Sequence, residues 1–291
     1  MPYDHIIYTV ENNVATVTLN RPDNLNAVTR VMMHEIMDAL DRTDTDPEVR
    51  AVIFTGAGKA FCAGADLVSK QIFDVFGERG EDEPEDSEDP LRDLGGRLTL
   101  RLFASLKPLI AAVNGAAAGI GATMLLPMDY RLASETARFG FVFTRVGIVP
   151  EAASAWFLPR LVGIARALDW TLSGRIFSAK VALEGGLVSA IHTPGDLLAA
   201  AHGIAREIAD NTAPVSVSLA RQLMWQGLTF DHPMEAHRID SRLMASRGAA
   251  RDVQEGIGAF LEKRRPNFAD RVPADLPPFA PWRKDPAFKH D

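Results

Sequence analysis

The sequence predicts an α/β protein whose first two thirds alternate strands with helices and whose last third is helical. Short apolar runs with strand character, closed by glycine, proline or asparagine, recur up to about residue 193. After Pro194 the strand signals disappear and helical periodicity replaces them. We therefore divide the chain into a core over residues 1–193, a helical region over 194–268 and a C-terminal extension over 269–291.

The N-terminal part of the core predicts a hairpin, a helix and a third strand. Residues 5–10 and 14–19 alternate polar and apolar side chains around a pair of asparagines, which is typical of a β-hairpin. Thr29 can cap a following helix that carries an apolar stripe. Residues 49–55 then form a third strand.

Two turns rich in small residues follow strands and are the first candidates for a binding element. The first spans residues 59–67, and the second spans residues 115–121, after an apolar strand over 108–114 and before a short helix. A glycine-rich turn of this kind exposes unpaired backbone N–H groups at a helix N-terminus, which suits an anion or a polarised carbonyl oxygen. The spacing matches neither a dinucleotide fingerprint nor a P-loop, so each turn alone indicates little more than tight packing.

The remaining elements follow from the same signals. Residues 78–90 are dominated by acidic side chains and prolines, which predicts a solvated loop or, alternatively, a lid over a cleft. Further helices are expected over 91–106, 152–161, 178–184, 196–210, 215–226, 233–246 and 250–263, and further strands over 129–133, 137–140 and 187–192.

Composition excludes several classes of function. The net charge is −7 and basic residues nowhere form a long run, so a nucleic-acid partner is not expected. Cys62 is the sole cysteine, which rules out an internal disulfide and indicates a reducing compartment. We see neither a signal peptide nor an apolar run long enough to span a bilayer, so we expect a cytoplasmic protein without a membrane partner.

A set of motifs, taken in order, resembles the crotonase (enoyl-CoA hydratase/isomerase) superfamily. Together the motifs cover residues 5–268 roughly, and their common order makes the resemblance specific although each motif alone is not. They are Asn20-Arg-Pro, Asn26-Ala27, Lys59-Ala-Phe-Cys-Ala-Gly-Ala-Asp-Leu67, Lys107-Pro, Ala112-Val-Asn-Gly115, Gly119-Ile-Gly121, Asp129, Gly147-Ile-Val-Pro150, Gly174-Arg-Ile-Phe-Ser-Ala179, Gly186-Leu-Val and Phe260-Leu-Glu-Lys-Arg.

The resemblance implies a crotonase-type spiral of ββα units with a C-terminal α-helical trimerisation region, and a homotrimer or hexamer. It implies an acyl-CoA thioester substrate, with CoA as part of the substrate, and no metal or other cofactor. Two backbone N–H groups that bind the thioester oxygen in the family match those of Ala65 and Ile120. The further positions expected to contact substrate or CoA are Lys59, Ala63, Gly64, Asp66, Leu67, Gly119, Gly121, Phe143 and Pro150.

The chemistry gives these positions a physical reason. Removing a proton beside a thioester places negative charge on its oxygen, and losing one preorganised donor to that oxygen typically costs about 3–4 kcal/mol of barrier. Small residues such as Gly119 let the backbone approach the ligand. Lys59 either meets the CoA phosphates or is simply solvated, and Asp66 is expected to order its turn through backbone hydrogen bonds.

The chain departs from the family's hydratases at both catalytic glutamates, where Thr123 and Phe143 stand instead. Glu151 matches the single acid of the family's enoyl-CoA isomerases, and one carboxylate suffices to move a proton between two carbons. We expect partial burial near Phe143, Ile148 and Val149 to raise the pKa of this carboxyl group. The alternative is that Glu151 merely complements a helix dipole as a first-turn residue.

The resulting hypothesis is an enoyl-CoA isomerase-type enzyme with Glu151 as acid and base. The alternatives are a hydratase with a rearranged site, an acyl-CoA hydrolase in which Glu151 activates water, and an acyl-CoA-binding homologue without catalysis.

Overall fold

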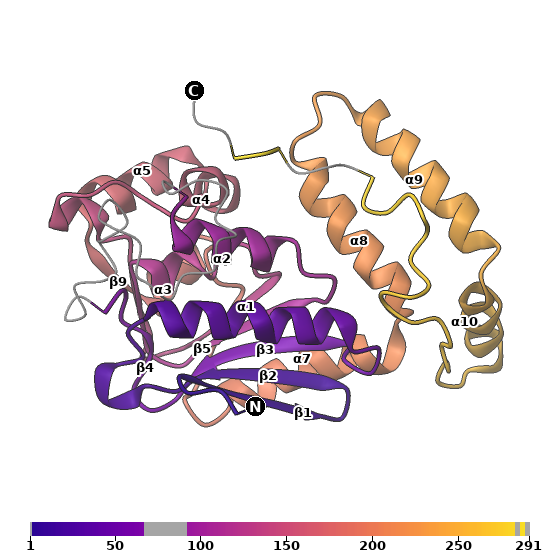
Figure 1. Ribbon diagram of the computed structural model, residues 1–291, viewed down its shortest axis with the longest axis horizontal. Helices are drawn as coiled ribbons and strands as arrows, with labels where there is room; N and C mark the ends of the chain where they lie inside the picture. Colours follow the sequence, from indigo (N-terminus) through magenta and orange to yellow (C-terminus); the bar gives the residue numbers. More distant parts are fainter. Residues whose placement is uncertain (1, 67–91, 283–285, 289–291) are drawn as a thin grey trace, which may run out of the picture.

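The computed structural model describes residues 2–66, 92–282 and 286–288 (Figure 1). Leu67 and the acidic segment over residues 78–90 lie outside these ranges, so the predictions made for them stay predictions. The larger of two sheets consists of β1 (Ile6–Glu11), β2 (Val14–Leu19), β3 (Ala51–Gly56), β5 (Leu109–Val113), β7 (Tyr130–Ser134) and β10 (Ala190–His192). The smaller sheet consists of β4 (Ala60–Cys62), β6 (Ala116–Ala118), β8 (Arg138–Gly140) and β9 (Ile176–Ser178).

The two sheets are built from a repeated unit, which confirms the predicted spiral. Strands β3, β5 and β7 of the larger sheet each lead directly to a short strand of the smaller sheet, β4, β6 and β8. The larger sheet is parallel apart from the β1–β2 hairpin, and β4, β6 and β8 are also parallel. Because each unit repeats the same turn from one sheet to the other, the ends of β4 and β6 come to lie side by side.

The central strands read as continuous apolar runs because both faces of the larger sheet are covered. Successive side chains of a strand point to opposite faces. In β3, Val52 and Phe54 therefore join the main core, and Ala51 and Ile53 join a second cluster on the outer face. That outer cluster is closed by one face of α7 (Leu197–Asn211).

The other helices are α1 (Arg30–Thr45), α2 (Leu94–Phe103), α3 (Ile120–Thr123), α4 (Ser154–Val162), α5 (Ile164–Ser173), α6 (Ala179–Glu184), α8 (Pro214–Gly227), α9 (Pro233–Gly248) and α10 (Arg251–Glu262). The predicted cap of α1 is present, since Thr29 accepts a hydrogen bond from the Met32 amide. The predicted boundary at residue 193 falls just before α7, the helix that packs on the sheet. In the described ranges, no helix combines the length and the apolar character that crossing a membrane requires.

Several local features differ from the sequence prediction. Strands β4 and β6 form where only turns were expected, and β9 was not predicted, because three residues are too few to show a period. Helix α4 begins at Ser154 rather than next to Glu151, since Ala152 and Ala153 adopt left-handed conformations with φ of 58° and 52°. Helix α5 was not predicted at all.

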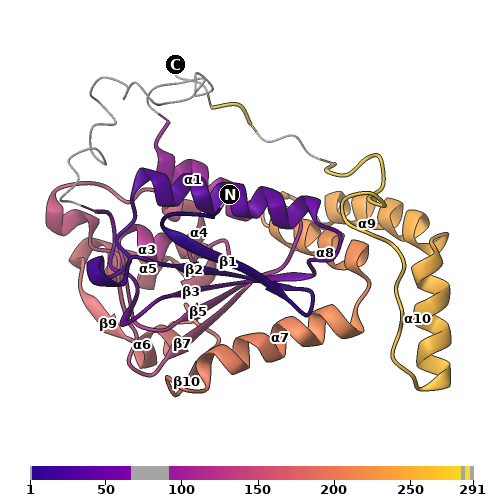
Figure 2. The same cartoon turned by 60° about the horizontal axis from the view of Figure 1, so that its bottom comes forward.

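Helices α8 to α10, which we call the arm, extend from one end of the molecule (Figures 1 and 2). Arg221 of α8 anchors the arm to the core, with only 4% of its side chain exposed. Its guanidinium pairs with Asp129 at 2.7 Å and donates to the carbonyls of Leu102, Phe103, Ser105 and Pro127. These carbonyls include those of Leu102 and Phe103 in the last turn of α2, where a cation is favourable.

Asp129 completes this anchor on the side of the core. Besides Arg221, it accepts hydrogen bonds from the Leu109 amide and the Trp225 indole, both at 2.8 Å. Asp129, the residue directly before β7, thus satisfies buried donors and also holds α8.

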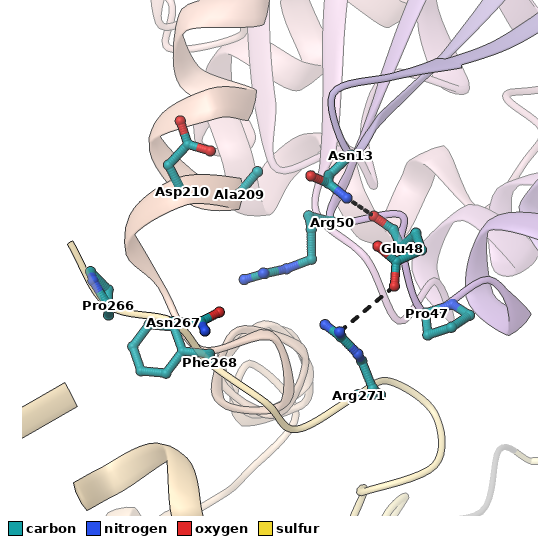
Figure 3. Close-up of a pocket in the computed structure, with 10 residues that line it drawn as sticks. All are labelled: Asn13, Pro47, Glu48, Arg50, Ala209, Asp210, Pro266, Asn267, Phe268 and Arg271. Carbon is teal, nitrogen blue, oxygen red and sulfur yellow. Dashed lines mark hydrogen bonds and ion pairs between the residues drawn. The ribbon is translucent and has the colours of Figure 1, made fainter. Parts of the chain in front are cut away.

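A pocket of about 260 Å³ lies where the C-terminal extension crosses the end of α7 (Figure 3). Arg50 and Arg271 point toward it, and Glu48 and Asp210 also line it. The positive charges of the two arginines are therefore matched by the negative charges of Glu48 and Asp210. The lining residues of the pocket include the end of α7 and the segment after α10. Figure 1 shows the arm at the opposite end of the molecule from β4.

Candidate active site

The two glycine-containing turns predicted from the sequence lie against each other at the ends of β4 and β6. The closeness depends on glycines. A Cβ placed on Gly64 would stand 3.2 Å from the Ala118 carbonyl oxygen, and one placed on Gly119 would stand 3.8 Å from the Gly64 Cα. Both glycines also have positive φ, 118° and 52°, which side chains disfavour.

The amides of Ala65 and Ile120 extend from these two turns. Ala65 forms an isolated parallel bridge with Val28, in which the flanking Gly64 carbonyl and Asp66 amide make the hydrogen bonds. In a parallel bridge the N–H of the central residue points away from the partner strand. Ile120 is the first residue of α3, where an N–H has no partner within the helix. Among the described residues, neither N–H has a hydrogen-bond acceptor.

Gly121 has a different role from the one expected. A Cβ on this residue would collide with the backbone and side chain of Cys62. Its hydrogen atom therefore allows α3 to pack on β4, and it leaves no open space in front of the residue. The same contact explains why Cys62 is completely buried.

Glu151 contacts α3, the helix that begins with Ile120. Thr123 of α3 donates a hydrogen bond of 2.7 Å to Glu151 Oε1. The other carboxylate oxygen lies against Gly95 of α2, where any Cβ would overlap Glu151 Oε2 and stand 3.2 Å from Ile120 Cδ1. The carboxylate is thus enclosed between α2 and α3, the helix whose first residue is Ile120.

Burial raises the pKa of Glu151 from 4.5 to about 7. The Thr123 hydrogen bond opposes this shift, and the negative charge of Asp93 adds to it. The predicted direction is thus correct, but two of the three residues expected around the carboxyl group are exposed. Val149 is 78% exposed and Ile148 is 37% exposed, so they do not enclose the carboxylate. The enclosing residues come from α2 and α3 instead.

The remaining predicted residues are distributed as follows. The Asp66 carboxylate is buried and pairs with Arg21 at 2.9 Å. Lys59 and Ala63 are exposed, and Phe143 is buried at the start of a short 3-10 helix (Phe143–Val146). Pro150 is half-buried directly before Glu151.

Thr123, Gly95 and Asp93 all contribute to the surroundings of Glu151, and none of these contributions was predicted from the sequence. Thr123 was noticed only as a missing glutamate, although a hydroxyl there can serve a carboxylate elsewhere. The Asp93 carboxylate caps α2 by accepting a hydrogen bond from the Gly96 amide at 2.6 Å. Aspartate is a preferred residue at this capping position, so the sequence contains a signal for a helix that begins here. The expected start of this helix at residue 91 concealed the signal.

Thr123→Val should move the acidic limb of the pH–rate profile to higher pH. The hydroxyl stabilises the ionised form of Glu151, so removing it raises the pKa of the carboxyl group further. The measurement is kcat/KM against pH with an enoyl-CoA substrate, and Thr193→Val is the control because Thr193 is bonded to Asp196 on the surface. An unshifted limb would show that Thr123 does not control this proton.

No group of three or more His, Cys, Asp or Glu side chains in the described ranges is arranged to hold a metal ion.

Comparisons with known proteins agree on one family. The family model described as enoyl-CoA hydratase/isomerase matches residues 9–271. An enoyl-CoA hydratase of Alternaria alternata, ACTT3, is 40% identical over 90% of this chain and 84% of its own. The 1,2-epoxyphenylacetyl-CoA isomerase of Escherichia coli K12 is 34% identical over 92% of this chain and 99% of its own.

Solved structures support the same assignment. The enoyl-CoA hydratase of Bacillus anthracis superposes with a TM-score of 0.82 at 31% identity, covering 91% of this chain and 99% of its own. An enoyl-CoA hydratase subunit of Geobacillus kaustophilus gives 0.80 at 31% identity over 92% and 99%. The chain therefore belongs to the enoyl-CoA hydratase/isomerase family, the crotonase superfamily, and is an enzyme of that type.

Proposed function

We propose that this enzyme moves a double bond in an enoyl-CoA thioester, with Glu151 as both base and acid. The thioester oxygen accepts hydrogen bonds from the Ala65 and Ile120 amides. Glu151 removes a proton from C2 of a 3-enoyl thioester, the electron pair passes onto the thioester oxygen as an enolate, and the carboxylic acid returns the proton to C4. The product is the conjugated 2-enoyl thioester, and no atom is gained or lost.

The observation that carries this proposal is the state of Glu151. A pKa of about 7 lets one group exist as carboxylate and as carboxylic acid at neutral pH, which a proton shuttle requires. The two N–H groups without acceptors among the described residues supply the complementary donors. CoA enters only as part of the substrate, and the exposed Lys59 ammonium is our candidate contact for its phosphates.

Hydration is the second candidate because curated relatives carry the name enoyl-CoA hydratase. It requires water to be placed and activated at the substrate's double bond. The positions of the family's two glutamates hold Thr123, which is bonded to Glu151, and the buried Phe143. This arrangement favours the proton shift over hydration.

The experiment is a spectroscopic assay of both substrate classes. The purified enzyme is incubated with a 3-enoyl-CoA and, separately, with a 2-enoyl-CoA, and the absorbance of the conjugated thioester is followed. A rise with the 3-enoyl substrate supports isomerisation, and a fall with the 2-enoyl substrate indicates hydration. Release of free CoA would indicate hydrolysis. Binding of these thioesters without turnover would overturn the enzymatic mechanism and leave a binding protein.

We further propose that the enzyme works as a homotrimer or hexamer, with α10 between subunits. Phe260 and Leu261 of α10 are 83% and 73% exposed, and α9 buries only Leu243 among its own residues. Such apolar exposure is typical of a surface that is covered by another molecule. Phe260→Asp should therefore shift the sedimentation profile toward monomer, whereas Val10→Asp on the edge strand β1 should not. A wild-type protein that sediments as a monomer would contradict this assembly.

A further inference from the structure

A second carboxylate approaches Glu151 from a part of the chain that the family motifs do not include. A Cβ placed on Gly95 would stand 3.2 Å from Asp93 Oδ1 on one side and overlap Glu151 Oε2 on another. The two carboxylates therefore converge on one glycine at the start of α2. Because Gly95 contributes only a hydrogen atom there, no side chain separates them.

Asp93 is held in this position by the helix that follows it. Its Oδ1 accepts the Gly96 amide at 2.6 Å, and its carbonyl accepts the Arg97 amide. A fixed negative charge therefore stands beside the carboxyl group that the proposed mechanism must protonate and deprotonate.

The other charged side chains in the described part of the chain do not shift the pKa of Glu151. Among the described residues, the one charged group that shifts the pKa of Glu151 is Asp93, and it acts in the same direction as burial. Other arginines on the neighbouring elements have other contacts: Arg101 pairs with Asp41 and Asp44, Arg145 packs on Gly174, and Arg160 lies over Trp156. These arginines do not neutralise the pair of carboxylates.

We propose that Asp93 is the second carboxylate of the site and a positioning residue for the proton on Glu151. This inference rests on the proposed function, in which Glu151 carries that proton between two carbons. Two like charges this close disfavour simultaneous ionisation. The negative charge of Asp93 therefore raises the pKa of Glu151, which strengthens Glu151 as a base and keeps its acid form populated at neutral pH.

The test is Asp93→Asn, which removes the charge and retains a good helix cap. The acidic limb of kcat/KM against pH should move to lower pH by about half a unit or more. Below pH 7 the variant should then gain activity relative to wild type, because more Glu151 is ionised. Above pH 8 it should lose activity, because Glu151 is a weaker base. Asp93→Glu should retain the wild-type limb, and Asp169→Asn, which breaks an exposed pair with Arg175, should not move it.

A readout without turnover separates this inference from the proposed function. Carbon-13 NMR of glutamate-labelled protein follows the titration of Glu151, whose signal is identified by its loss in Glu151→Gln. A lower titration midpoint in Asp93→Asn supports the inference even if none of the enoyl-CoA substrates is turned over. An unchanged midpoint in a folded Asp93→Asn variant would overturn it, whatever the activity.

Discussion

Glu151→Gln should lower kcat for the double-bond shift by roughly 10²- to 10⁴-fold, the range that general acid–base catalysis contributes. Glutamine has nearly the same shape and can still accept the Thr123 hydrogen bond through its carbonyl oxygen, but it cannot take up the substrate's proton. The measurement is steady-state kinetics together with CoA-thioester affinity, which should change little. Glu135→Gln, at an exposed position, is the matched control. Retained turnover in Glu151→Gln would end the proposed mechanism.

The same substitution should make the protein more stable at pH 8. The pKa of Glu151 lies at about 7 in the folded chain and near 4.5 when unfolded. Stability from this group is therefore complete below pH 4.5 and declines as the pH rises to about 7, because the unfolded chain releases its proton first. Glutamine suffers no such loss, so Glu151→Gln should gain up to about 3 kcal/mol at pH 8 and little at pH 4. Opposite signs for activity and stability would identify a carboxyl group buried for its chemistry.

Arg221→Met should destabilise the protein by about 3–5 kcal/mol, the usual cost of removing one partner of a buried ion pair. The side chain is 4% exposed, and its loss leaves the partly buried Asp129 carboxylate opposite an apolar group. It also leaves carbonyls at the end of α2 without their donor. The free energy of unfolding is measured by denaturant titration at a fixed protein concentration, because assembly contributes to stability.

The control for this prediction is Arg175→Met. Arg175 pairs with Asp169 at the surface, with both side chains about half exposed, and such pairs contribute at most about 1 kcal/mol. If both variants lost the same small amount, Arg221 would not be the anchor between the arm and the core.

The α/β fold class could be predicted from the sequence because its main strands are continuous apolar runs and because its helix caps depend on residues that are close in sequence. β3 and β5 have five or six residues each and are covered on both faces, so composition alone marks them. The short strands β4 and β6 carry no such signal and depend on the larger sheet for their position. The start of α4 also escaped prediction, because two alanines in the left-handed conformation contradict their own helix propensity.

The backbone part of the site could be predicted from the sequence, but the residues that surround Glu151 could not. Glycines mark the turns of Ala65 and Ile120, since only glycine tolerates those conformations and contacts. The surroundings of Glu151 come from Gly95 and Thr123, which are distant in sequence, and nothing local links them. Three-dimensional proximity alone reveals that α2 and α3 enclose this carboxylate.

The arm has a thermodynamic consequence for the whole molecule. Its buried cluster consists of Val215, Leu219, Leu243 and Val272, too small a nucleus to hold three helices independently. Within the proposed assembly, α10 would therefore become fully ordered only when another chain arrives. Dilution would then destabilise the arm before it destabilises the sheets, and the melting temperature would rise with protein concentration.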